Sequence, residues 1–137
     1  MKVLMLVLTV VFLSATLLGC EGNIDVRGKV YFDNSRKPYL RIVGDSREIL
    51  DDTLKPLSGV KVELLMPSEY THLMDNPWRE EATDPDGSFR LFSTVPRGYY
   101  KFIIRMSKED YEPIEIELDY MRDRRATLEG VMIKKQQ

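Results

Sequence analysis

The chain of 137 residues has only one cysteine and one histidine. A single cysteine excludes a disulfide bond within the chain, and with one histidine it excludes a Cys/His zinc site of the usual ligand number. Charge of one sign is not in excess either, because 20 Lys and Arg residues stand against 22 Asp and Glu residues. Since a nucleic-acid-binding protein normally carries a basic excess, no nucleic-acid partner is expected.

Hydrophobic residues make up 43% of the chain and charged residues 31%. These proportions are typical of a folded globular protein and not of a disordered one. The length allows one domain, or one small domain preceded by a targeting segment.

The first twenty residues favour the second of these arrangements. Lys2 precedes an uncharged, mostly apolar run over residues 3–18, and the next charged residue is Glu21. A basic start, a short apolar stretch and a small residue at its end are typical of a secretory signal peptide. The alternatives are a transmembrane anchor and a buried core helix, but the run is short for a span of about 20 residues. We therefore expect residues 1–19 to be a cleaved signal peptide.

The end of this segment, Leu17-Leu18-Gly19-Cys20, resembles the lipobox of bacterial lipoprotein precursors. The resemblance implies that Cys20 receives a diacylglyceryl thioether and becomes the mature N-terminus, with residues 20–23 as a short tether. It also implies a lipid-anchored protein of the bacterial cell envelope, at the outer membrane if the organism has one. Two or more acyl chains anchor a protein durably, whereas one chain alone binds marginally.

Alternation of apolar and polar residues with period two runs through the rest of the chain and predicts half-buried β-strands. The segments with this pattern are 24–32, 60–66, 78–83, 88–91, 100–106, 114–120 and 126–133. Asp84–Gly87 and Val95–Gly98 have the Pro and Gly positions of type I turns. Without any helical stripe, the pattern predicts an all-β fold, an antiparallel seven-stranded β-sandwich.

Several fragments together resemble the carboxypeptidase regulatory-like domain, a transthyretin-like (Ig-like) β-sandwich of bacterial exported proteins. These fragments are Val26–Val30, Pro56–Leu64, Thr83–Leu91 and Val95–Phe102. The resemblance implies one such domain over residues 24–137, usually noncatalytic and without a cofactor. The chain departs from the family in having Asp110 where Gly usually precedes the tyrosine, and in a long insertion at about residues 33–58.

The insertion is longer than an ordinary connecting loop and is expected to have structure or function of its own. Tyr39–Val43 and Arg47–Leu50 could pair as a small hairpin. If successive strands are antiparallel, the insertion and the turn at Asp84–Gly87 lie at the end of the sandwich away from the lipid. Partner binding is accordingly expected on the insertion.

The loop before the last strand should lie at the opposite end, near the membrane. It contains Arg122, Arg124 and Arg125, which could contact lipid headgroups. The alternative is a solvated turn that only keeps the end of the sheet soluble.

Catalytic and metal-binding patterns are weak. Asp84, Asp86 and Ser88 resemble the start of a calcium loop, but the required Gly and Glu positions hold other residues, so a hairpin turn is expected and no metal site. His72 has no triad or nucleophile motif around it. Intradiol dioxygenases and transthyretin-like hydrolases have related sandwiches with several histidines in their sites, and one histidine does not provide such a site. The chain is not expected to be an enzyme.

Two functions remain open. The first is a noncatalytic, lipid-anchored envelope protein that acts as a protein-binding or structural module. The second is a carbohydrate-binding lipoprotein, in which Tyr70, Trp78 and Tyr99 form a stacking platform for a glycan. The opposing interpretation places Trp78 in the core of the sandwich, so its exposure separates the two.

Overall fold

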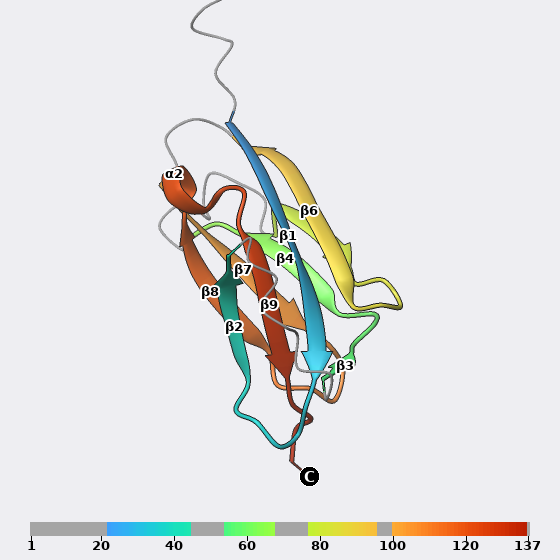
Figure 1. The fold of residues 1–137 in the computed structure, drawn as a ribbon. Helices are drawn as coiled ribbons and strands as arrows, with labels where there is room; N and C mark the ends of the chain where they lie inside the picture. Colours follow the sequence, from blue (N-terminus) through green and yellow to red (C-terminus); the bar gives the residue numbers. More distant parts are fainter. Residues whose placement is uncertain (1–21, 45–53, 68–76, 96–99, 137) are drawn as a thin grey trace, which may run out of the picture.

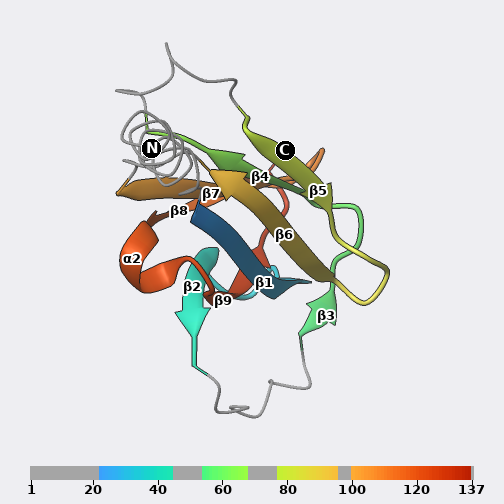
Figure 2. The same cartoon turned by 90° about the horizontal axis from the view of Figure 1, so that it is seen from above.

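A computed structural model describes residues 22–44, 54–67, 77–95 and 100–136. They form two β-sheets that face each other, with one short helix at one end (Figures 1 and 2). The elements are β1 (Gly22–Phe32), β2 (Tyr39–Val43), β3 (Lys55–Pro56), β4 (Lys61–Leu65), β5 (Arg79–Ala82), β6 (Ser88–Val95), β7 (Lys101–Ser107), β8 (Ile114–Asp119), α2 (Tyr120–Asp123) and β9 (Thr127–Met132). The predicted β-sandwich is confirmed.

One sheet has the order β2-β9-β1-β3, with β6 also paired to β1, and the other has the order β5-β4-β7-β8. Inward-facing side chains of both sheets form the core, which explains the period-two pattern. In β7, for example, Phe102, Ile104 and Met106 are almost completely buried. Pairs such as Phe102 with Leu118 and Ile104 with Leu64 align the core residues across neighbouring strands.

The prediction of a purely antiparallel sandwich is wrong for one pair of strands. β9 runs parallel to β1, with Arg27 opposite Thr127 and Phe32 opposite Met132. The reason is the crossing before β9: β8 belongs to the second sheet, and the chain passes through α2 to the first sheet. β9 therefore begins at the same end of the sandwich as β1 (Figure 1).

We call this end, where β1 begins, the Gly22 end. β6 finishes there because Val95 pairs with Gly22, and β7 starts there because Lys101 pairs with the last residue of β8. The turn at Asp84–Gly87 lies at the far end, where the amide of Gly87 donates to the carbonyl of Asp84 (2.8 Å). A positive φ of 79° at Gly87 suits glycine in this turn. The turn at Asp84–Gly87 thus lies at the end that strand alternation predicts for it, whereas the predicted turn at 96–98 lies outside the described residues.

The insertion departs from expectation. Tyr39–Val43 forms β2, which pairs with β9 and returns along it toward the Gly22 end instead of staying at the far end. The other half of the expected hairpin, Arg47–Leu50, lies outside the described residues. Leu54 follows it and packs with Tyr31 and Val131 in a small second cluster on the outer face of the first sheet. Tyr31, which alternation places on the solvent side, is consequently only 5% exposed.

Candidate functional site

The turn that joins β8 to β9, residues 119–125, is held in one conformation by its two aspartates. The side chain of Asp119 caps α2 by accepting hydrogen bonds from the amides of Met121 (2.9 Å) and Arg122 (3.1 Å). The carboxylate of Asp123 accepts the amide of Asp119 (3.0 Å) from inside the turn. Both acidic groups are therefore used to shape the turn.

Asp123 is buried and also binds the guanidinium group of Arg122. Nε of Arg122 lies 3.0 Å from Oδ1 and Nη2 lies 3.0 Å from Oδ2, a two-pronged arrangement. The hydrogen bonds from Arg122 hold the pKa of Asp123 below its ordinary value of 3.8, although burial acts in the opposite direction. Arg122 is thus paired within the turn, although its side chain stays 75% exposed.

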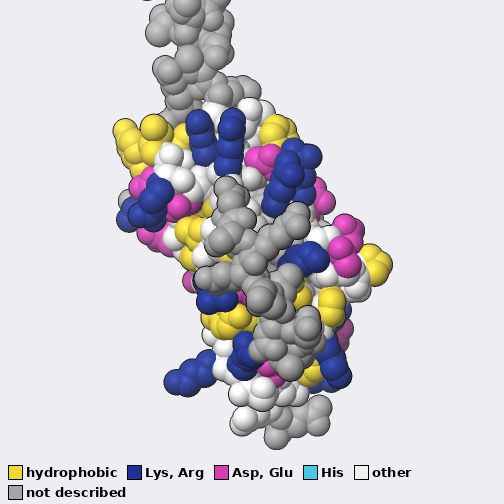
Figure 3. Space-filling view, viewed as in Figure 1, with side chains coloured by type: hydrophobic (Ala, Val, Ile, Leu, Met, Phe, Trp, Pro, Cys, Tyr) yellow, Lys and Arg dark blue, Asp and Glu magenta, His cyan; other side chains and the backbone are white. Residues whose placement is uncertain are grey.

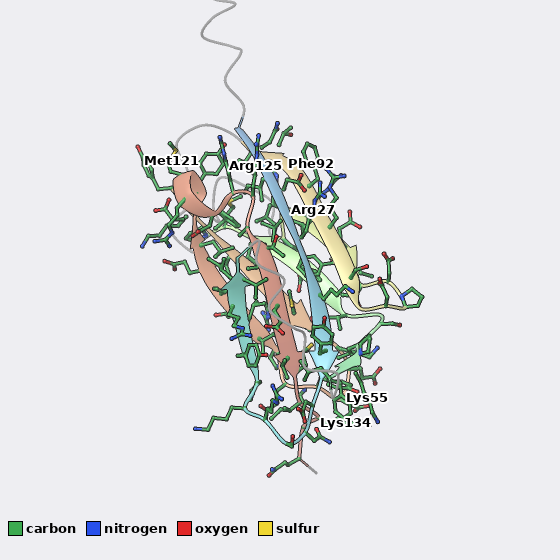
Figure 4. All side chains as sticks on the ribbon, in the orientation of Figure 1. Arg27, Lys55, Phe92, Met121, Arg125 and Lys134 are labelled. Atoms are coloured by element: carbon green, nitrogen blue, oxygen red, sulfur yellow. The ribbon has the colours of Figure 1, made fainter. Side chains whose placement is uncertain are left out.

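The other two candidate arginines are oriented differently. The guanidinium group of Arg124 lies over the ring of Tyr120, 5.9 Å from its centroid, and its backbone carbonyl accepts the amide of Asp25 in β1 (2.8 Å). The side chain of Arg125 is exposed and makes no ion pair with the described residues. Figure 4 shows it at the Gly22 end, between Met121 and Phe92. Arg124 and Arg125 are therefore available to an external anion.

The start of β1 lies directly against this turn. A Cβ atom at Gly22 would lie only 1.7 Å from the phenol oxygen of Tyr120, so that ring occupies the space which a side chain at Gly22 would need. The amides of Asp25 and Arg27 donate to the carbonyls of Arg124 (2.8 Å) and Ala126 (3.2 Å). The point where the chain enters the sandwich and the arginine-bearing turn are thus parts of one surface.

Two large hydrophobic side chains, Met121 and Tyr100, are strongly exposed at this end. Met121 is 74% exposed, although it lies in a rigid turn. Tyr100, the first residue of the strand predicted over 100–106, is 68% exposed and does not belong to the buried face of that strand. The reason is that β7 begins at Lys101, and the alternation that buries Phe102 does not extend back to Tyr100. A lone methionine among the charged residues 119–125 was the available signal for Met121.

Figure 3 shows this end of the molecule in a space-filling view. Basic side chains gather at the Gly22 end, and hydrophobic side chains lie on both sides of them. Exposed basic and hydrophobic side chains thus occur together at the Gly22 end, with Met121, Arg124 and Arg125 among them.

The predicted carbohydrate platform is only partly described. Tyr70 and Tyr99 lie outside the described residues, as do His72 and Cys20. Trp78 is partly buried and packs against the core, and its indole N–H donates to the hydroxyl of Ser93 (3.0 Å) and the carbonyl of Thr94 (3.1 Å). Trp78 thus ties the start of β5 to the end of β6, which agrees with the core interpretation.

The described residues offer little else that resembles a site. An open depression of about 230 Å³ lies between β5 and β6, lined by Arg79, Glu81, Arg90 and Phe92. Arg90 is already paired with Asp25 (3.0 Å). Within the described ranges, no three His, Cys, Asp or Glu side chains are placed to hold a metal ion. The same ranges contain no helix with the length and apolar character needed to cross a membrane.

The turn makes a testable prediction through Asp123. A carboxylate whose pKa is lower in the folded than in the unfolded state stabilises the fold above its ordinary pKa, and this contribution is lost as the pH falls through the folded-state value. We expect Asp123→Asn to lower the free energy of unfolding by about 1–3 kcal/mol at pH 7, because a buried charged hydrogen-bond partner is lost. Urea unfolding at pH 7 and pH 3 measures this difference.

The difference between Asp123→Asn and the wild type should shrink at pH 3, because pH 3 lies below the ordinary pKa of 3.8 and the unfolded chain then binds a proton that the folded chain resists. Glu115→Gln, at an exposed position of β8, is the matched control and should change stability by no more than about 0.5 kcal/mol. An Asp123→Asn deficit of the same size at both pH values would contradict the prediction.

Comparison with known proteins places the chain by its fold. No family model and no curated protein match it. Among solved structures, 3-chlorocatechol 1,2-dioxygenase from Rhodococcus opacus is similar with a TM-score of 0.51 and 14% identity, over 85% of this chain and 61% of that one. Two variants of the shaft pilin SpaA from Lactobacillus rhamnosus GG have TM-scores of 0.50 and 0.52 and identities of 11% and 13%, over 85% and 84% of this chain and 52% of theirs.

The chain thus spans between about half and three-fifths of the length of these proteins. At such low identity the similarity shows the β-sandwich alone and transfers neither the activity of the dioxygenase nor the assembly of the pilin. The chain is a β-sandwich of the kind shared by a dioxygenase and a shaft pilin.

Proposed function

We propose that this protein is a lipid-anchored, noncatalytic module of the bacterial cell envelope that binds or supports another protein. The observation that carries the proposal is the junction Leu17-Leu18-Gly19-Cys20, which is followed after one residue by the first residue of β1. A lipid on Cys20 would hold the sandwich directly at a membrane surface, and outer-membrane placement is expected where there is one.

The structural part of the proposal is supported by the fold. A β-sandwich similar to that of a shaft pilin, a structural protein by its name, suits a module that presents surfaces and loops. Three buried polar groups of the described residues are used in structural contacts: Asp123 shapes a turn, Glu129 pairs with Arg41 (2.7 Å), and Thr83 donates to the carbonyl of Leu57 (2.8 Å). These contacts support a framework role for the groups in question.

A Cys20→Ser variant tests the anchor. We expect the wild-type protein to incorporate an alkyne-tagged fatty acid and to float with membranes in a density gradient, because two or more acyl chains anchor durably. The variant should incorporate no label. Lys55→Ala, an exposed change in β3, is the control and should behave as the wild type. Equal labelling of wild type and Cys20→Ser would overturn the proposal.

Crosslinking in intact cells tests the second half of the proposal. A benzophenone side chain in place of Ile42, an exposed position of β2 within the insertion, should give a discrete higher-mass product with a neighbouring protein. The same probe on the solvent side of β8 is the control. Crosslinks to glycan at Trp78, with no protein product at β2, would instead favour the carbohydrate-binding alternative.

A further inference from the structure

We propose that the Gly22 end docks onto an anionic phospholipid surface, with Met121 and Tyr100 among the headgroups and Arg124 and Arg125 on their phosphates. The inference rests on the proposed lipid anchor at Cys20. It goes beyond that anchor because it gives the domain a fixed orientation on the membrane.

The length of the tether is the first argument. β1 begins at Gly22, so only Glu21 separates the first strand residue from Cys20. Two residue steps span at most about 7 Å. The headgroup regions of the two leaflets together measure about 10–15 Å. A tether of this length therefore keeps the Gly22 end of the sandwich at the headgroup region of the leaflet that holds the lipid.

The contact between Gly22 and Tyr120 is the second argument. Because the phenol oxygen of Tyr120 fills the space beside Gly22, the turn 119–125 adjoins the point from which the tether leaves. The backbone bond from Asp25 to Arg124 keeps the turn there. A lipid at Cys20 therefore places this turn, and not the far end of the sandwich, against the membrane.

The charges of the turn are the third argument. Its two acidic groups are engaged within the turn, Asp119 as a cap and Asp123 with Arg122. Arg124 and Arg125 remain with their guanidinium groups exposed, and arginine binds phosphate oxygens in a two-pronged geometry. The surface presented to the bilayer is thus basic, which complements anionic phospholipid.

The apolar side chains are the fourth argument. Apolar side chains can insert between lipid headgroups at a membrane interface. Tyrosine is enriched there because its ring is apolar while its hydroxyl stays in contact with water. Met121 and Tyr100 are the two most exposed large hydrophobic side chains among the described residues. Both lie at the Gly22 end, because Tyr100 precedes β7 and its carbonyl accepts the amide of Tyr120 (2.8 Å). Basic and apolar side chains together match a lipid surface better than either does alone.

A fluorescent probe at position 121 tests this docking in the full lipidated protein. Cys20 is the only cysteine and is blocked when lipidated, so Met121→Cys provides the one free thiol. The labelled protein is reconstituted into phosphatidylglycerol vesicles that contain a spin-labelled lipid. Lys55→Cys, at the opposite end of the sandwich in Figure 4, is the matched position. We expect strong quenching at position 121 and little at position 55.

The arginines are tested in the same assay. Arg124→Gln and Arg125→Gln should each lower the ratio of docked to undocked protein about fivefold. This factor corresponds to the binding free energy of about 1 kcal/mol that one basic residue contributes near an anionic surface. Phosphatidylcholine vesicles should have a similar effect on the wild type. Arg105→Gln, an exposed basic residue on β7, is the control and should leave the quenching unchanged.

The outcomes separate the docking from the anchor. Equal quenching at positions 121 and 55 in protein that floats with the vesicles would overturn the docking and leave the anchor standing. If quenching at position 121 is unchanged by both arginine substitutions and by the lipid charge, the proposed phosphate contact is wrong. Protein that carries no lipid at Cys20 and does not float would overturn both proposals. Quenching confined to 121 and dependent on Arg124 and Arg125 supports the docking.

Discussion

Replacing Phe102 with alanine is expected to lower the free energy of unfolding by about 3–5 kcal/mol. Phe102 is 1% exposed and is the largest fully buried side chain in the described part of the chain. It lies on β7, a central strand of the second sheet, opposite Leu118 of β8. Truncation removes buried apolar area and leaves a cavity that two hydrogen-bonded neighbouring strands prevent from closing.

Chemical denaturation and thermal unfolding measure this loss, which corresponds to a fall in melting temperature of about 10–20 °C for a domain of this size. Phe92→Ala is the matched control, since Phe92 is 45% exposed on β6 and contacts Arg90 across its ring (5.8 Å). The control should lose no more than about 1 kcal/mol. Similar losses for both variants would contradict the assignment of the core.

Gly28→Ala is expected to destabilise the first sheet by about 3 kcal/mol, the upper end of the usual cost of overpacking. A Cβ atom at Gly28 would lie 2.1 Å from the carbonyl oxygen of Leu128 and 2.9 Å from Cε1 of Phe89. The first contact is with backbone, which cannot rotate away as a side chain can. The added methyl group would therefore push β9 away from β1 and disturb the parallel pairing.

Lys29→Ala is the neighbouring control. Lys29 is exposed on the outer face of β1, and its truncation should change stability by no more than about 0.5 kcal/mol. The denaturant midpoints of the two variants, compared at an unchanged m-value, measure the difference in stability. A Gly28→Ala variant as stable as Lys29→Ala would show that β1 and β9 are not as close as described.

Local patterning predicted the strands well, because alternation reports directly which side chains face a core. Val26 and Val30 on β1 and Ile104 on β7 are buried as their spacing predicts. The same pattern cannot specify which strand lies beside which. The parallel pairing of β1 with β9 depends on α2, a helix of four residues that is too short to show a periodic pattern.

The errors on the surface have a related cause. Tyr31 faces outward from its sheet as alternation predicts, yet it is buried because Leu54, 23 positions later, covers it. Tyr100 and β2 are similar cases, since the first residue of β7 and the partner of β2 depend on the rest of the fold. The face of a strand to which a side chain points is set by the local sequence. Whether another segment buries that side chain, and which strands pair, depend on the tertiary structure.

The candidate site shows the same division. The sequence placed three arginines in one loop and that loop at the end where β1 begins, and the structure brings them there. It did not distinguish them, because the distinction depends on Asp123: this buried carboxylate pairs with Arg122 and not with Arg124 or Arg125, although all three arginines are exposed. The exposure of Met121 follows from the cap at Asp119 and required the structure as well.

The proposed lipid on Cys20 holds the Gly22 end of the sandwich at a membrane. Tandem mass spectrometry of the N-terminal peptide from the membrane-extracted protein can detect this lipid. We expect a mature chain that begins at Cys20 and carries a diacylglyceryl group on its sulfur. A peptide that retains residues 1–19, or one with an unmodified thiol at Cys20, would contradict it.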